Sequence, residues 1–285
     1  MSANASSKNP VVIPDSKKEA LKRLTSAPAV AWPTVGLALW IVLGVSVTDY
    51  LAVTKVIPLW AGLLLNIVFM YPTFHVAHDA LHRAVSTNQW LNDKIGSLAL
   101  LFSIPEVSLG VFRYSHIIHH RFTNDEQDPD HYVHGSNWLS TVLRWMTFEL
   151  YYVYYNLKSG NPRGKKAVIS GIPMFAFTIL VFAALCSFGY GLEATMLWLI
   201  PSRITIALIA CVFLWMPHLS EGEGGGIEYI HTAKSSQDNL TAGTTMRIGS
   251  EGVLKVLMQW HNYHLIHHLW PTTPSYNHEK HKKNF

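Results

Sequence analysis

Four long apolar stretches constrain the fold of this chain more than any other feature of its sequence. They cover residues 29–47, 56–74, 167–187 and 193–216. A helix that crosses the hydrocarbon core of a bilayer needs about 20 mostly apolar residues. The composition agrees, because 14% of the residues are charged, against roughly 25% in soluble domains. We therefore predict an all-α integral membrane protein with four transmembrane helices.

Two further segments have the composition of membrane-associated structure without the length to cross. Residues 98–112 are apolar, but Pro105 and Glu106 interrupt them, which favours a re-entrant or interfacial segment. Residues 138–157 are rich in Trp, Tyr and Phe, which favours one helix at the level of the lipid headgroups, with a soluble core helix as the alternative. We expect one domain over 1–285, with tails at 1–27 and 272–285 and a short amphipathic helix at 16–24.

The positions of Lys and Arg predict the orientation of the chain. The two short outer loops hold Lys55 alone, whereas the N-terminal tail, residues 83–166 and the segment after the fourth span hold nearly all the others. Positive residues mark the cytoplasmic side, so we expect both tails in the cytoplasm. We also expect a bacterial inner-membrane location and no signal peptide. The net charge of +4 is modest, and no nucleic-acid partner is expected.

Eight histidines fall into three clusters with helical spacing. Residues three or four apart share one face of a helix, so each cluster would line a helix with imidazoles. Neutral imidazole is a common metal ligand. The clustered residues are His78, His82, His116, His119, His120, His264, His267 and His268, whereas we expect His134, His218, His278 and His281 to be isolated packed or surface residues.

The number and type of these side chains indicate a site for two metal ions. The clusters lack the thiolates of structural zinc sites, the two cysteines (Cys186 and Cys211) lie in apolar runs, and no H-E-x-x-H motif is present. Imidazole suits iron, zinc and copper, so the ligand type leaves the metal open. Eight or nine ligands are nonetheless too many for one tetrahedral zinc ion. The predicted orientation places all three clusters on the cytoplasmic side.

Together the three clusters resemble the histidine boxes of the membrane fatty acid desaturase and hydroxylase superfamily. The boxes are His78-x-x-x-His82, His116-x-x-His119-His120 and His264-x-x-His267-His268, and residues 262–271 are similar to an ending common among the desaturases. The resemblance implies two iron ions bound almost wholly by histidine in a cytoplasmic helical cap, with O2 as co-substrate. It also implies one more histidine between the fourth span and the last box, a position that His231 matches.

The resemblance implies an oxidoreductase that acts on unactivated C–H bonds of a long-chain lipid, a fatty acid or fatty acyl chain above all, by desaturation or hydroxylation. Terminal-alkene-forming fatty acid decarboxylation and carotenoid or alkane hydroxylation are alternatives that the boxes do not separate. The sequence shows no flavin, nicotinamide or iron–sulfur motif, so we expect an external electron donor such as a ferredoxin, rubredoxin or cytochrome. A histidine-rich metal transporter is a remote alternative, because its histidines should lie at bilayer depth.

Acidic side chains are candidates to accept hydrogen bonds from the free ring N–H groups of ligating histidines. Asp79 and Asp128 are favoured for this role. Arg203 lies inside the fourth span, where a charge is costly, so it is either functional or directed to the outer surface. Residues 69–74 and 213–216 should form the upper walls of an apolar substrate tunnel, with residues 98–112 at its side. The remaining acidic candidates are Asp125, Asp130 and Glu228.

Overall fold

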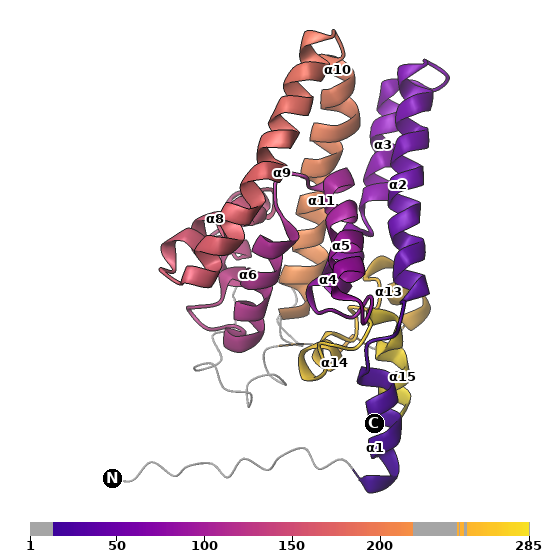
Figure 1. The fold of residues 1–285 in the computed structure, drawn as a ribbon, viewed down its shortest axis with the longest axis vertical. Helices are drawn as coiled ribbons and strands as arrows, with labels where there is room; N and C mark the ends of the chain where they lie inside the picture. The colour runs from indigo at the N-terminus through magenta and orange to yellow at the C-terminus, as the bar shows by residue number, and fades with distance from the viewer. Residues whose placement is uncertain (1–13, 219–243, 245, 248–249, 285) are drawn as a thin grey trace.

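The computed structural model describes residues 14–218, 244, 246–247 and 250–284 (Figure 1). These residues are predominantly helical, and they form no strand beyond an isolated bridge between Met246 and Tyr263. Four segments are long and apolar enough to cross a membrane, which confirms the predicted fold class. They are α2 (Trp32–Val53), the combined segment Leu59–Leu81, α9 (Pro162–Ser187) and Gly191–His218.

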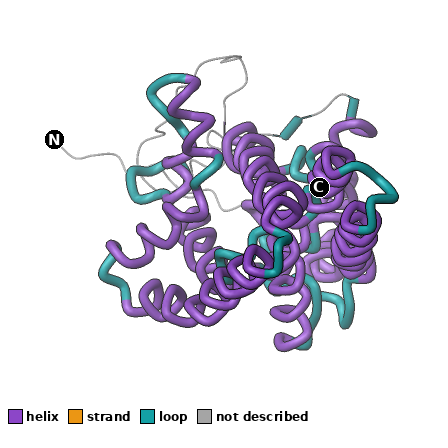
Figure 2. The backbone as a smooth tube through the Cα atoms, turned by 90° about the horizontal axis from the view of Figure 1, so that it is seen from above, coloured by secondary structure: helices purple, strands orange, loops and turns teal. Residues whose placement is uncertain are grey.

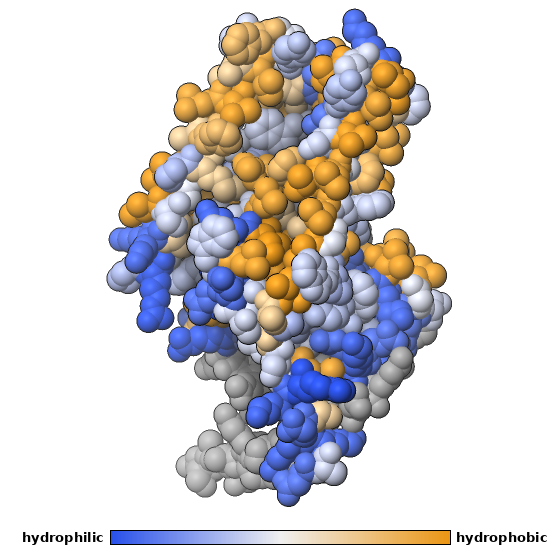
Figure 3. All heavy atoms as spheres, turned by 45° about the vertical axis from the view of Figure 1, so that its right-hand side comes forward, coloured by the Kyte–Doolittle hydropathy of each residue, from blue (hydrophilic) through white to orange (hydrophobic). Residues whose placement is uncertain are grey.

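The spans form two hairpins whose turns lie at the same end of the molecule. In Figure 1 the upper right hairpin joins α2 to α3 (Leu59–Met70), and the upper left hairpin joins α9 to α10 (Gly191–Ala194). Figure 3 shows apolar side chains over this upper half and hydrophilic ones over the lower half. Leu43 is 60% exposed and Leu180 is 68% exposed. A broad exposed apolar surface of this kind is suited to lipid rather than water.

The second span is interrupted by a turn at Tyr71 and Pro72, between α3 and α4 (Thr73–Leu81). Proline fits here because the first residues of a new helix have no intrahelical partner for their N–H groups. Every residue of α4 is buried, and the helix packs against α5 (Gln89–Ser103) and α2. His78 therefore lies inside the protein, whereas His82, at the end of the helix, is half-buried. The helical segment continues beyond the predicted end at residue 74.

The segment predicted to be re-entrant is divided between two helices. Helix α5 ends at Ser103, and α6 (Leu109–Phe122) begins after Ser108, whose hydroxyl accepts a hydrogen bond from the Val111 N–H at 3.4 Å. The intervening residues 104–108 contain the predicted break at Pro105. Figure 1 places α5 between the two hairpins and α6 lower in the molecule, so the second cluster is brought to the same end as the first.

The aromatic segment 138–157 forms two helices, so the prediction of one continuous helix is wrong. Helix α7 (Trp138–Trp145) begins at Asn137, whose side chain accepts from the Ser140 N–H at 2.9 Å. The chain breaks at residues 146–147, and α8 (Phe148–Lys158) follows. The break lets α7 leave Leu139 72% exposed, while α8 packs against α6 and α9.

The fourth span contains two π-helical turns that align its lower end with the histidines. They are η2 (Thr195–Leu199) and η3 (Ala210–Trp215), on either side of α11 (Ile200–Ile209), and the 3-10 turn η4 (Met216–His218) follows. A proline clashes with the carbonyl four residues earlier in a regular α-helix. The residues four positions before Pro201 and Pro217 are Leu197 in η2 and Phe213 in η3. The wider π-helical turns at these residues relieve the clash. His218 is consequently held in a buried position.

Arg203 is paired within the protein rather than directed to the outer surface. Its Nη1 lies 2.6 Å from Glu149 Oε1, and its Nη2 forms an ion pair with Glu106. Its side chain is 21% exposed and the Glu149 side chain is fully buried. The charge thus joins the fourth span to α8 and to the turn before α6. Of the two alternatives for Arg203, the one that directs it to the outer surface is wrong.

The ends of the described chain pack together beneath the spans. Helix α1 (Asp15–Thr25) contacts α15 (His278–Asn284), which confirms the short helix predicted at 16–24. Figure 2, seen from above, shows helices and their connecting loops in the described parts. The other elements at this end are η1 (Pro129–Val133), α13 (Glu251–Leu257), α14 (His264–Leu269) and η6 (Ser275–Asn277).

Candidate metal centre

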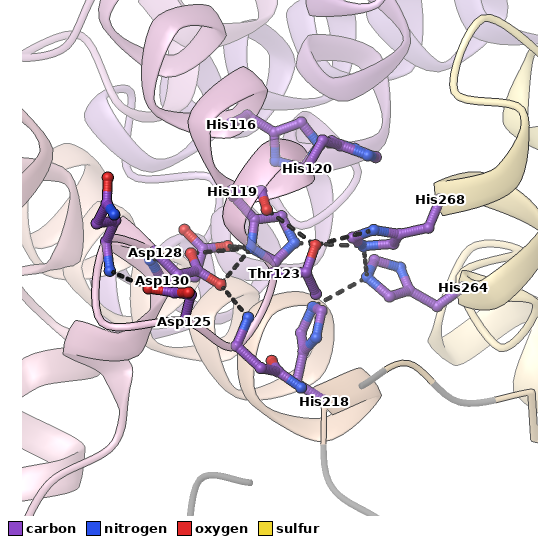
Figure 4. A network of polar contacts seen from close by, with 12 residues as sticks. His116, His119, His120, Thr123, Asp125, Asp128, Asp130, His218, His264 and His268 are labelled. Atoms are coloured by element: carbon purple, nitrogen blue, oxygen red, sulfur yellow. Dashed lines mark hydrogen bonds and ion pairs between the residues drawn. The ribbon is translucent and has the colours of Figure 1, made fainter. Parts of the chain in front are cut away.

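Three helices bring the predicted histidine clusters together. The first cluster lies at the end of α4, the second on α6 and the third on α14. The site is deeply buried: His119 and His267 are 0% exposed. Figure 4 shows side chains from α6 and α14 directed toward one another, with His218 of the fourth span directed to the same place. Residues separated by more than 180 positions in sequence therefore meet in one site.

One group of ring nitrogens draws on all three clusters. His78, His82, His116 and His267 offer nitrogen atoms that lie within 4.8 Å of one another. The Nε2 atoms of His78 and His267 are 3.1 Å apart. His120 joins this group from the side, because its Nε2 lies 2.8 Å from His267 Nε2 and 3.0 Å from His116 Nε2.

A second group lies beside the first. It contains His119, His218, His264 and His268, again with the nitrogen atoms within 4.8 Å of one another. His268 Nε2 is 3.3 Å from His119 Nε2 and 3.0 Å from His264 Nε2. The His264 and His218 Nε2 atoms are 3.1 Å apart. His120 stands between the groups, since its ring centroid is 4.3 Å from that of His268.

The chemistry of these nitrogens fits two cations. Each ring nitrogen of a neutral imidazole carries either one proton or one lone pair. His267 Nε2 faces two other ring nitrogens, so it cannot form a good hydrogen bond with both of them at once. Burial, followed by repulsion from His278, Arg113 and His119, lowers the pKa of His82 to about 3. A cation between lone pairs satisfies such buried neutral rings. Burial and then the neighbouring imidazoles also lower the pKa values of His116, His120, His264, His267 and His268.

His218 is the histidine that sequence reasoning missed. It was expected to be an isolated packed or surface residue, but it belongs to the second group. The signal that could have found it is its position at the end of a span, where η3 and Pro217 change the helical register. Simple i, i+3 spacing carries no such signal. His231, the further histidine that the resemblance implies, lies outside the described residues, and so does Glu228.

Asp128 supports the second group, as predicted. Its two carboxylate oxygens lie 3.0 and 2.9 Å from His119 Nδ1, and they also accept from the backbone N–H groups of Asn124 and Asp130 at 2.8 Å. A carboxylate on Nδ1 fixes the ring with Nε2 facing the other histidines (Figure 4). Burial lowers the pKa of His119, but the charges of Asp128 and Asp130 outweigh it and raise that pKa to about 9.

Asp79 plays a different part from the predicted one. Its Oδ1 accepts from the Ser275 hydroxyl at 2.6 Å and from the Ser275 N–H at 3.1 Å, and its Oδ2 accepts from the Thr34 hydroxyl at 2.7 Å. The nearest imidazole contact is His75 Nε2 at 3.5 Å, and His75 lies outside both groups. Asp79 therefore ties α2 and the segment before α15 to α4 instead of orienting a clustered histidine.

A strained turn precedes the third cluster. Gln259 and Trp260 have φ values of 47° and 66°, a region that costs a non-glycine residue roughly 1–2 kcal/mol. The Gln259 carbonyl faces two rings, with His75 Nδ1 at 3.2 Å and His261 Nδ1 at 3.3 Å. These contacts hold the turn so that α14 begins with its histidines facing α4 and α6.

The fold and the site define a class: a helical membrane protein with two adjoining histidine groups that could each hold a metal ion. A family model described as fatty acid desaturase matches residues 54–285. The chain belongs to the fatty acid desaturase family, which confirms the resemblance noted in the sequence.

A curated relative shares part of this sequence. Over 83 residues the chain is 40% identical to an omega-3 fatty acid desaturase of Caenorhabditis elegans. The match covers 27% of this chain and 20% of that protein, so the chain matches about a fifth of the relative's length.

Proposed function

We propose that this protein is an O2-dependent di-iron oxidoreductase that desaturates or hydroxylates the acyl chain of a lipid. The observation that carries the proposal is the pair of four-histidine groups, seven of whose eight side chains are buried, within a chain of the desaturase family. Family membership supports an oxidoreductase acting on lipid, and the name of the partial relative favours desaturation over the other outcomes. Decarboxylation and carotenoid or alkane hydroxylation remain alternatives with the same site.

Two iron ions would be held by the histidines of the two groups, with His120 beside the first and His231 as a further candidate. Bound iron would supply the activation of O2 and the removal of hydrogen from an unactivated carbon. The chain supplies the rest: His119 is oriented by Asp128, and the buried α4 excludes water from the first group. A dry site of this kind keeps the reaction away from solvent.

An apolar recess beside His78 is the proposed position of the reacting carbon. It is a cavity of about 10 Å³ lined by Phe74, Leu100, Ile104 and other apolar residues, with the His78 ring in its wall. Phe74 stacks on His78 at a centroid distance of 5.1 Å. Leu100 and Ile104 belong to the predicted side wall at 98–112, so the recess matches that part of the predicted tunnel. A chain can enter only when these side chains separate.

A larger cavity at the depth of the spans could take the remainder of a long chain. Its volume is about 470 Å³, and it is lined largely by apolar side chains of α2, α9 and the upper part of the fourth span, with two residues of α5. Met70 lines this cavity, and Thr73, three residues later, lines the recess and is hydrogen-bonded to Ser103. Each methylene removed from water contributes about 0.8 kcal/mol, so an apolar cavity favours a hydrocarbon over a polar metabolite.

The orientation and the electron supply are also part of the proposal. The distribution of Lys and Arg supports a cytoplasmic location for both tails and for the histidine groups, in a bacterial inner membrane. We propose a ferredoxin, rubredoxin or cytochrome as the external electron donor. We further propose that 1–285 acts as a single domain, because the first and last described helices pack together.

The test is to purify the protein in lipid nanodiscs and to measure metal content, O2 uptake with a reduced donor, and lipid products by mass spectrometry. We expect about two irons per chain and an unsaturated or hydroxylated acyl product. Full activity with stoichiometric zinc in place of iron would sink the di-iron proposal. Turnover of water-soluble substrates alone would refute the lipid assignment, and metal flux across vesicles without lipid oxidation would favour a transporter.

A further inference from the structure

A groove lies beside helix α7, between that helix, Tyr132 of η1 and Arg203 of the fourth span. Its volume is about 520 Å³, within the range of pockets that bind small molecules. Polar side chains of Asn137, Ser140, Arg144 and Thr147 line it, together with the apolar side chain of Leu143. The groove therefore combines cationic side chains, several hydrogen-bonding groups and apolar surface.

Arg144 is the cation that the groove offers. Its Nη1 donates to the His134 carbonyl at 2.7 Å and to the Tyr132 carbonyl at 3.4 Å. Its guanidinium lies over the Tyr132 ring, 5.3 Å from the ring centroid. These contacts fix the plane of the guanidinium without neutralising it. Arg203, which also lines the groove, is different because Glu106 and Glu149 balance its charge.

The rim of the groove has the composition of a membrane interface. Trp138, Leu139 and Leu143 of α7 are 51%, 72% and 55% exposed. A helix with such an apolar face and an arginine in its last turn is suited to lie at the boundary between headgroups and hydrocarbon. Arg203 Nη1 donates to the Met146 carbonyl at 3.2 Å. This hydrogen bond ties the end of α7 to the fourth span and so fixes the depth of α7 relative to the spans.

A separate apolar cavity lies near Arg203, at the depth of the spans. It has a volume of about 300 Å³ and lies between α9 and the fourth span. Ser202 and Glu106, the neighbour and the ion-pair partner of Arg203, mark its lower end. Ile179, Phe182 and Leu199 line its upper part. Arg203 thus lines the groove, while its neighbour and its ion-pair partner line the apolar cavity, so the two sites lie on either side of this ion pair.

We propose that this groove binds the anionic headgroup of a bilayer phospholipid, with its phosphate against Arg144 and one acyl chain in the cavity between α9 and the fourth span. An arginine binds phosphate well because its planar donors match the phosphate oxygens. An amphiphile satisfies both halves of the arrangement at once, whereas a soluble anion leaves the apolar half unfilled. This bound lipid is separate from the acyl chain that is oxidised, so the proposal does not depend on the proposed function.

The experiment measures lipid retained by the whole protein. Protein in nanodiscs of phosphatidylcholine with a minor fraction of phosphatidylglycerol is transferred to detergent, and bound lipid is counted by native mass spectrometry. We expect about one phosphatidylglycerol per chain, retained in preference to phosphatidylcholine. Arg144→Gln should weaken this binding about tenfold, because a charge-assisted hydrogen bond is lost. Arg163→Gln, the same change at an exposed arginine on α9, should leave it unchanged.

A second variant guards against a loss of fold at Arg144. Ser140→Phe fills the groove while Arg144 keeps its carbonyl contacts, and it should also reduce lipid retention, with the thermal unfolding midpoint unchanged. Equal retention in Arg144→Gln and Arg163→Gln would overturn the proposal, and so would undiminished retention in Ser140→Phe. Inorganic phosphate added alone tests the other source of the same chemistry. If it binds at Arg144 and phosphatidylglycerol does not, the lipid assignment is wrong.

Discussion

Two buried polar clusters in this molecule differ in how their charges are balanced. Around Arg203 the cation and the carboxylates of Glu106 and Glu149 are all supplied by the chain. At the metal centre the chain supplies ring nitrogens of one kind, set 2.8–3.3 Å apart across the two groups. In the first cluster the charges are paired within the chain, whereas the second brings together lone pairs that a cation would satisfy. We infer that the first serves the fold and the second serves a bound metal.

The elements that carry the two clusters differ in the same way. The ion cluster joins three segments at the level of the spans, where an unpaired charge would be costly. The histidine groups lie at the ends of α4, α6 and the fourth span, where strained turns and widened helical turns set the direction of each ring. Breaking each cluster in turn should therefore have different consequences.

The largest effect is expected for a histidine at the middle of the first group. His267→Ala should remove most bound iron and abolish activity, because the His267 Nε2 atom faces both His78 and His120. Metal analysis and product formation by the purified variant check this. His131→Ala is the matched control, a histidine outside both groups, and should retain iron. Normal iron in the His267 variant would contradict the assignment of the site.

The next effect separates the structure from the sequence pattern. His218→Ala should lower bound iron from about two to about one per chain, because His218 belongs to the second group alone. Mössbauer spectroscopy of the iron-loaded variant should then show the loss of one of the two iron environments. Retention of both irons would show that His218 is a packing residue after all.

Much of this architecture follows from the sequence for simple physical reasons. Span length is set by bilayer thickness, so the four apolar stretches identify the four spans. The i, i+3 and i, i+4 spacing shows which histidines share a helical face. The sequence also marked Asp128 as a candidate to orient a ligating histidine, and the structure identifies His119, nine residues away, as its partner.

The rest depends on packing between distant segments, which no local rule describes. His218 joins the centre only because η3 and η4 alter the helix register. Asp79 lies next to His78 in sequence, yet its carboxylate reaches Ser275 and Thr34 instead. The partners of Arg203 come from the turn before α6 and from α8, so its role as an ion-pair residue is visible only in three dimensions.

The ion cluster should respond in stability rather than in metal content. Arg203→Met leaves the Glu149 carboxylate buried without its cation and should cost about 3–5 kcal/mol. Replacing all three residues, as Arg203→Met, Glu106→Gln and Glu149→Gln together, should recover most of that loss. Unfolding in mixed micelles measures the stability, and iron per chain should stay unchanged in the triple variant. A triple variant no more stable than Arg203→Met would show that the charges themselves are required.

A smaller effect is expected from the carboxylate that orients His119. Asp128→Asn should weaken iron binding roughly 10–100-fold, the usual loss when such a partner is replaced. Asp79→Asn is the matched control, since Asp79 contacts neither histidine group directly, and should lower stability while leaving iron affinity nearly unchanged. Equal losses of iron affinity in the two variants would indicate that both act through the fold.

The smallest effect concerns the pH dependence of stability in protein stripped of metal. The pKa of His82 is lowered to about 3, against about 6.5 in an unfolded chain. Between these values the unfolded chain binds a proton that the folded chain refuses, so stability falls as pH drops below 6.5. From pH 7 to pH 6 this amounts to roughly 0.7 kcal/mol for one such histidine. His119 acts in the opposite sense, because its pKa is raised to about 9. Its contribution to stability is complete below about 6.5 and is lost as pH rises toward 9.

Comparing the unfolding of stripped wild-type protein and of stripped His82→Gln at pH 7 and pH 6 isolates the contribution of His82. Between these two pH values the variant should lose roughly 0.7 kcal/mol less stability than the wild type. An identical loss in both proteins would mean that His82 takes up a proton in the folded state, and the histidine groups would then be less dry than the structure indicates.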